Sequence, residues 1–101
     1  MVMMHAGFVG AIVAIYNLIL FVYKYNIMSR LHVEREALKA LGKKIKEVRL
    51  FKKFSQMKLA ALSDSEKSNI SRLESGNANP TFLTLRRIAG ILKVAVVDLI
   101  P

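Results

Sequence analysis

The sequence predicts an all-α protein in which a bundle of five short helices follows one hydrophobic helix. Three observations support this fold class. Apolar residues recur at helical spacing through most of residues 38–101, only the short stretch 93–97 alternates as a strand would, and residues 1–23 carry no charged side chain. The 101 residues are enough for one small domain and an appendage.

The composition argues against several classes of protein. A hydrophobic content of 53% excludes a disordered basic tail, although 16 Lys+Arg against 7 Asp+Glu give a net charge of +9. Cysteine is absent, which excludes a disulfide scaffold and a thiolate metal site. The two histidines are His5 and His32, and no glycine-rich phosphate loop occurs. We therefore expect no metal, no cofactor, no catalytic residue and no enzymatic activity.

Residues 6–23 form an apolar run whose only strongly polar member is Asn17. As a helix, the run would span about 27 Å, close to the ~30 Å hydrocarbon core of a membrane. Tyr16, Tyr23 and Tyr25 lie towards its C-terminal end beside Lys24, as at a membrane interface. The run therefore predicts a membrane anchor that would hold the rest of the chain on the cytoplasmic side of the inner membrane.

Residues 1–27 have two other interpretations. A secretory signal fits poorly, because no basic region precedes the apolar run and no small-residue cleavage site follows it cleanly. Alternatively, translation starts at Met28, which begins a sensible soluble protein. The anchor and the start-site artefact both remain open. In either case residues 28–101 form a separate domain with 15 basic and 7 acidic side chains, and its net charge of +8 indicates nucleic acid or anionic lipid as a partner.

The first two helices of this domain are predicted over 34–53 and 55–62. In the first, Leu38, Leu41, Ile45 and Val48 form one apolar stripe, while Gly42 is a mild penalty of about 1 kcal/mol. Ser55 is a suitable N-cap for the second. The polar residues 63–65 then form a break.

The third helix is predicted from Glu66 to about Ser75, with Gly76 as its C-terminal stop. Its narrow apolar edge consists of Ile70 and Leu73. A fourth helix follows the cap Thr81, and a last helical turn covers residues 96–100. The inner face of the fourth helix is expected to hold five residues, which are Phe82, Leu85, Ile88, Ala89 and Leu92.

The second and third helices have the spacing of a helix-turn-helix. If Ile70 points inward, 100° steps place Ser68, Ser71 and Arg72 outward, with Lys67 and Asn69 on the flanks. A helix with such a free polar face fits the major groove of DNA.

The stretch from Leu41 to Leu99 resembles the Cro/lambda-repressor-like helix-turn-helix domains. The resemblance rests on the runs Ser55–Ala60, Ile70–Gly76, Asn79–Thr81 and Thr84–Leu85, which match the family without a gap. It implies the five-helix lambda-repressor-like fold, dimeric binding to short sites in double-stranded DNA, and transcriptional regulation.

Site residues follow from the resemblance position by position. It implies that Gln56 contacts phosphate and that Asn77 and Asn79 lie along the phosphates. The residues implied to face bases or flank them on the helix are Lys67, Ser68, Asn69, Ser71 and Arg72. Arg49 and Glu74 occupy the positions of a structural ion pair that ties the first helix to the third.

The sequence departs from the family pattern at the turn. Asp64 and Ser65 stand where the family usually has glycine and then an apolar residue. Asp64 and Glu66 also place negative charge near the path of the phosphates. The leading hypothesis is a sequence-specific DNA-binding regulator that contacts the groove with helix 66–75. The alternative is an antitoxin-like module that binds a partner protein.

Overall fold

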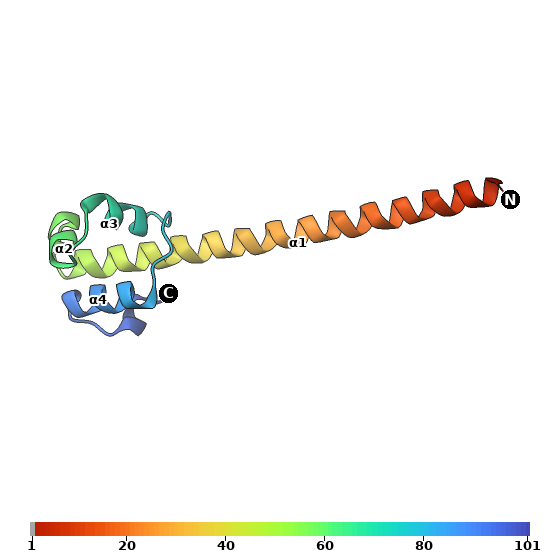
Figure 1. Cartoon of the computed structure of the whole chain (residues 1–101). Coiled ribbons are helices and arrows are strands. Elements are labelled where there is room, and N and C mark those ends of the chain that lie inside the picture. The colour runs from red at the N-terminus through yellow and green to blue at the C-terminus, as the bar shows by residue number, and fades with distance from the viewer. Residues whose placement is uncertain (1) are drawn as a thin grey trace. The chain divides into compact units, whose positions relative to one another are not determined.

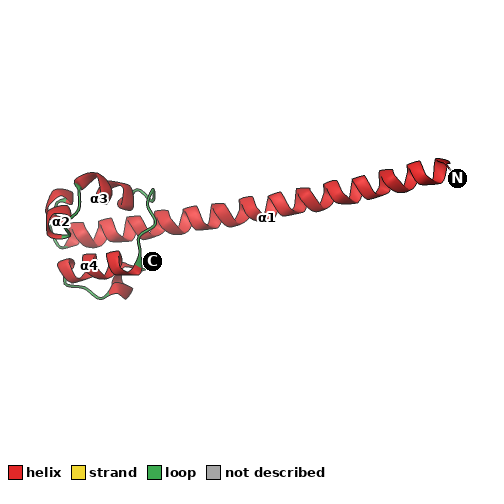
Figure 2. Cartoon of the chain, viewed as in Figure 1, coloured by secondary structure: helices red, strands yellow, loops and turns green. Residues whose placement is uncertain are grey.

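The computed structural model describes the backbone of residues 2–101 and the side chains from residue 7 onward. Every regular element in this part of the chain is helical, and none is a strand (Figure 2). The elements are α1 (Val2–Phe51), α2 (Gln56–Leu62), α3 (Lys67–Glu74), α4 (Phe82–Leu92) and the 3-10 helix η1 (Val96–Leu99). The all-α class is confirmed. The expected count of five helices in the bundle is not, because its last element is a single 3-10 turn.

The apolar helix and the first helix of the domain, expected as separate elements, are one helix. α1 runs without a break from Val2 to Phe51. Residues 24–37 contain neither glycine nor proline, so nothing in that stretch ends the helix. The chain divides by its internal contacts into two units, Met1–Val33 and Glu34–Pro101. Both this junction and the boundary expected after residue 27 lie within α1.

The apolar run leaves its side chains uncovered. All side chains from Gly7 to Tyr23 are exposed. By length and composition, α1 contains a stretch that is able to cross a membrane. The side chains of Ala6, where the expected anchor begins, and of His5 lie outside the described part.

The helices of the second unit begin at the predicted caps. The Ser55 hydroxyl accepts the Lys58 N–H at 3.0 Å, and the Thr81 hydroxyl accepts the Thr84 N–H at 3.2 Å. These bonds satisfy N–H groups that a helix start leaves without a partner. At the start of α3, the N-cap Glu66 makes no such side-chain bond.

Each of the four α-helices ends in a Schellman motif with one residue in the left-handed region. After α1, the Phe54 N–H donates to the Arg49 carbonyl at 3.0 Å and the Lys53 N–H to the Leu50 carbonyl at 2.9 Å. The same pair of bonds follows the other three helices. The left-handed residues are Lys53 (φ 61°), Asp64 (φ 52°), Gly76 (φ 81°) and Lys93 (φ 56°). Gly76 is the predicted stop of α3 and the one glycine among them.

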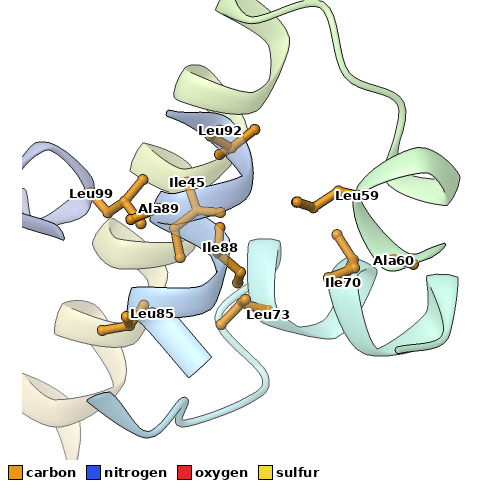
Figure 3. Close-up of a cluster of buried hydrophobic side chains, with 10 residues drawn as sticks. All are labelled: Ile45, Leu59, Ala60, Ile70, Leu73, Leu85, Ile88, Ala89, Leu92 and Leu99. Atoms are coloured by element: carbon orange, nitrogen blue, oxygen red, sulfur yellow. The ribbon is translucent and has the colours of Figure 1, made fainter. Parts of the chain in front are cut away.

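The core of the second unit draws on every helix. Figure 1 shows the C-terminal part of α1 with α2 and α3 on one side and α4 on the other. Buried apolar side chains fill the space between them (Figure 3). They are Ile45, Leu59, Ala60, Ile70, Leu73, Leu85, Ile88, Ala89, Leu92 and Leu99.

Phe82 is an exception to the predicted inner face of α4. It is 65% exposed, whereas the other four residues of that face are buried. Helical period places Phe82 on the correct side of α4, but it is the first residue of the helix. The spacing of apolar residues does not show whether another helix covers the first turn of α4.

Candidate nucleic-acid interface

The short helices α2 and α3 are separate elements joined by residues 63–66. Ile70 and Leu73 hold α3 against the core, with exposures of 3% and 5%. The opposite side of α3 is free. Its exposed residues are Lys67, Ser68, Asn69, Ser71 and Arg72. These are the residues expected to face or flank the bases. A helix of about 10–12 Å diameter fits a major groove about 12 Å wide.

A buried ion pair connects α1 to the end of α3. The Arg49 Nε lies 2.6 Å from Glu74 Oε2, and Nη2 lies 3.0 Å from Oε1. The third guanidinium nitrogen, Nη1, donates to the Phe54 carbonyl at 2.7 Å. Both side chains are nearly inaccessible, at 6% and 3% exposure. The bidentate geometry fixes α3 in orientation as well as distance.

α1 and α3 also touch through their main chains at Gly42. A Cβ at this position would overlap the Leu73 carbonyl oxygen and would lie 2.6 Å from that of Glu74. Any side chain would therefore push the two helices apart. The glycine that costs helix propensity in the sequence permits this close approach. Sequence reasoning noted only the penalty, although an isolated glycine within a helical pattern was the available signal.

Gln56, the first residue of α2, turns its amide towards the ion pair. Its Nε2 donates to Glu74 Oε1 at 3.0 Å, and the side chain is half-buried. Glu74 therefore holds α1, α2 and α3 together. One N–H of the Gln56 amide is used in this bond, and the other forms no hydrogen bond within the described part of the chain.

Residues 45–99 match the family model that describes helix-turn-helix domains. This span is more than half of the chain and contains α2, α3, α4 and η1. The chain belongs to the helix-turn-helix family. The family is of the Cro/C1 type, as the resemblance of the sequence indicated.

Solved structures with the same helix-turn-helix fold include two regulators. The restriction-modification controller protein C.AhdI from Aeromonas hydrophila has a TM-score of 0.62 and 28% identity, over 64% of this chain and 94% of that one. The clp gene regulator ClgR from Corynebacterium glutamicum has a TM-score of 0.61 and 25% identity, over 62% and 67%. The family and these two neighbours support a DNA-binding transcription regulator.

An enzyme also contains a similar domain. Hydroxypropylphosphonic acid epoxidase from S. wedmorenis has a TM-score of 0.63 and 25% identity, over 66% of this chain and 36% of the enzyme. The likeness is therefore limited to about a third of that protein. No curated protein matches the sequence.

Most polar side chains on the outer face of the helix-turn-helix make weak local contacts. Ser68 Oγ lies 3.4 Å from Glu66 Oε2, and Asn69 Nδ2 lies 3.2 Å from Ser65 Oγ. Arg72 Nη2 reaches the Asn77 carbonyl at 3.4 Å. All three contacts are exposed and those of Ser68 and Arg72 are long, so water or another ligand can replace them at little cost. The exposed Lys67 ammonium forms no ion pair in the described part of the chain.

The loop after α3 places the two predicted phosphate contacts at the surface. Asn77 and Asn79 are both exposed. The Asn77 side chain donates to Ser75 Oγ at 3.1 Å. Asp64 and Glu66, the acidic residues of the turn, are exposed too. Near α3 they partly offset the positive charge of Lys67 and Arg72.

The turn accommodates the two departures from the family pattern. Asp64 adopts the left-handed conformation at φ 52°, which glycine adopts without strain and aspartate tolerates better than most residues. Ser65 is half-buried and places a hydroxyl, in place of an apolar side chain, at this point of the turn. Arg87 on α4, a residue that sequence reasoning did not single out, reaches the turn through a 3.5 Å contact between its Nη1 and the Ser63 carbonyl.

Proposed function

We propose that this chain is a transcription regulator that recognises a specific sequence in double-stranded DNA through α3. The observation that carries the proposal is the free polar face of α3, held in place by the buried contacts of Glu74 with Arg49 and Gln56. A helix fixed in this way presents the same side chains at the same angle in every complex. This constancy is required for discrimination between base pairs.

Roles follow from the position of each side chain. Arg72 contacts a guanine through its bidentate guanidinium, and Lys67, Ser68 and Ser71 contact neighbouring base edges. Asn69 contacts either a base or the backbone. Gln56, Asn77 and Asn79 contact phosphates and set the register of the protein on the duplex.

The direct test is selection of duplexes from a random library by the full chain, followed by affinity measurements at several salt concentrations. We expect one enriched sequence and a log–log decrease of affinity with salt of about 0.9 per phosphate contact. Binding without any sequence preference would contradict the specific part of the proposal. If no duplex is retained even at low salt, the chain is not a DNA-binding protein.

We also propose that the protein binds DNA as a homodimer. The regulator family and the apolar side chains exposed at the C-terminal end support this. Val97 in η1 is 72% exposed and Ile100 is 47% exposed. A two-fold symmetric selected site and a two-protomer complex in sedimentation are the expected results.

The apolar run of residues 6–23 supports a membrane anchor. A helix with this length, composition and exposure fits a bilayer better than water. The DNA-binding domain would then lie on the cytoplasmic face of the inner membrane.

The alternative, an antitoxin-like module that binds a partner protein, gains support from exposed apolar residues on α4. Phe82 is 65% and Leu83 67% exposed. A partner retained at high salt without DNA binding at low salt would favour it. In both cases we propose a binding protein rather than an enzyme, because the family match covers the helix-turn-helix and the regulators C.AhdI and ClgR share this fold.

A further inference from the structure

A cavity of about 300 Å³ lies between the α2–α3 turn, α3 and α4. Its apolar wall consists of Ile70, Leu73, Ala78, Pro80 and Ile88. On the turn side it is lined by Ser63, Asp64 and Ser65. The short polar side chain of Ser65, at a position where the family usually has an apolar one, takes up little of this space.

Two guanidinium groups line the same cavity, and neither has a carboxylate partner. Arg72 and Arg87 contact backbone carbonyls only, at 3.4 and 3.5 Å, which is the long limit of a hydrogen bond. The salt bridges among the described residues involve Arg49 with Glu74 and Lys39 with Glu36. Asp64 is the one carboxylate in the lining, so the lining carries a net positive charge.

We propose that this cavity binds a small organic anion, a carboxylate carried on an apolar ring or short chain. The carboxylate would pair with the Arg87 guanidinium, for which a two-point hydrogen bond is the favoured geometry. The apolar body would lie against Ala78 and Pro80, the half-buried apolar residues of the lining, because Ile70 and Ile88 are 3% and 1% exposed and leave little surface free for contact. The volume is at the lower end of the range for ligand sites, about 300–1,000 Å³, and therefore fits a small ligand.

The cavity shares residues with the face proposed to contact DNA. Arg72 and Asn69 line the cavity and are also exposed on α3. A bound carboxylate would draw the Arg72 guanidinium away from the groove. The ligand would thus lower the affinity for DNA, and this coupling rests on the function proposed above. Binding to the cavity does not depend on it.

Binding is tested on the full chain in phosphatidylcholine nanodiscs, by methyl NMR, with benzoate as the probe and benzamide as its uncharged counterpart. At constant ionic strength, we expect benzoate to produce saturable shifts at the Ile70, Ile88 and Ala78 methyl groups. Benzamide should bind at least about tenfold more weakly, because it lacks the charge that pairs with arginine. Absent shifts, or equal affinities for the two probes, would overturn the proposal.

Three variants locate the site. Arg87→Gln should weaken benzoate binding about tenfold, whereas Arg86→Gln, an exposed neighbour outside the cavity lining, should leave it unchanged. Ser65→Phe, which adds a much larger side chain at the turn side of the lining, should weaken benzoate binding by taking up part of the space, with the charges intact. The methyl spectrum itself reports whether each variant is folded. Equal effects of Arg87→Gln and Arg86→Gln would place the anion elsewhere, and undiminished binding by Ser65→Phe would place it outside the cavity.

The coupling is tested with the duplex selected by the chain. Saturating benzoate should weaken binding of the original protein and leave that of Arg87→Gln nearly unchanged. If benzoate binds but DNA affinity does not change, the coupling is wrong and the cavity site remains. If no duplex binds at all, the proposed function fails, and the NMR result alone decides the ligand site.

Discussion

Arg72 is the side chain on which the proposed sequence specificity depends most. It is exposed on α3, and the one hydrogen bond of its guanidinium among the described residues is the long bond to the Asn77 carbonyl. Arg72→Ala should lose about 1–3 kcal/mol of discrimination at one base position, with folding retained. Duplex selection with the variant would show a relaxed position. As a control, Arg86→Ala removes a positive charge from α4 and should leave the selected sequence unchanged. If Arg72→Ala also left the selected sequence unchanged, Arg72 would not contact a base.

Lys93 adopts a backbone conformation that suits glycine better. It follows α4 at φ 56°, where a Cβ is crowded against the carbonyl that follows. We expect Lys93→Gly to raise the free energy of unfolding by about 0.5–1 kcal/mol, measured by urea unfolding followed at the Ile45 methyl signal. Lys46→Gly, in the interior of α1, is the matched control and should be destabilising by about 1 kcal/mol. A destabilised Lys93→Gly would show that the lysine side chain contributes more than its backbone strain.

The helices α1, α2 and α3 are coupled through the Glu74 carboxylate. Glu74→Ala would leave the Arg49 guanidinium buried without its partner, so we expect a loss of about 3–5 kcal/mol in the free energy of unfolding. Glu36→Ala removes a carboxylate from the exposed pair with Lys39, whose atoms lie 3.5 Å apart, and should change stability by less than about 0.5 kcal/mol. Similar losses in both variants in urea unfolding would mean that the buried pair does not hold α3.

Because α1 and α3 are in contact at Gly42, replacing Gly42 or Gly90 by alanine should change the free energy of unfolding in opposite directions. Gly42→Ala should destabilise the domain by about 1–3 kcal/mol, since the added methyl group would meet backbone carbonyls that cannot rotate away. Gly90→Ala in α4 meets nothing within 4 Å and should be stabilising by up to about 1 kcal/mol. Thermal unfolding of both variants checks the pair, and a neutral Gly42→Ala would contradict the close approach.

The sequence was most informative for elements bounded by local chemistry. The caps Ser55 and Thr81 and the stop Gly76 lie where the pattern placed them, because each acts through bonds to its own turn of helix. The end of α1 was harder to predict. It stops at a lysine in the left-handed region, a conformation that the residue type does not indicate. The continuity of α1 was missed for the converse reason, since a change from apolar to charged composition does not end a helix.

At the scale of the whole chain, the proposed membrane anchor is tested by where the protein fractionates. Ile12 is 50% exposed within it, so Ile12→Arg would place a charge in the bilayer if the run is inserted. The translocon scale gives about 2.5–3.5 kcal/mol for a central arginine, which should move much of the protein from the membrane to the soluble fraction. Val33→Arg, also exposed but outside the run, should leave fractionation unchanged. An equal distribution of both variants would argue against the anchor.

The fold and the free face of α3 were accessible from the sequence, but the cavity was not. Apolar spacing identifies which side of each helix is buried, and the turn at Asp64 and Ser65 marks a departure from the family pattern. Whether a small side chain leaves a cavity depends on the distance between α3 and α4. The spacing of residues along the sequence does not give this distance. The involvement of Gln56 with Glu74 was missed in the same way, since 18 residues separate them in sequence.

The close approach at Gly42 separates the residues that position α3 from the residues that it exposes. α3 is positioned from behind, by carbonyl groups of its last turn and by one buried carboxylate, and none of these atoms belongs to the residues that project outward. Substitutions on the exposed face, at Lys67, Ser68, Ser71 and Arg72, would therefore alter which duplex is preferred. They would leave the contacts that position α3 intact. The residues that position α3 and the residues proposed to contact bases can therefore change independently. A few substitutions on the exposed face of α3 would be enough to change the preferred DNA sequence.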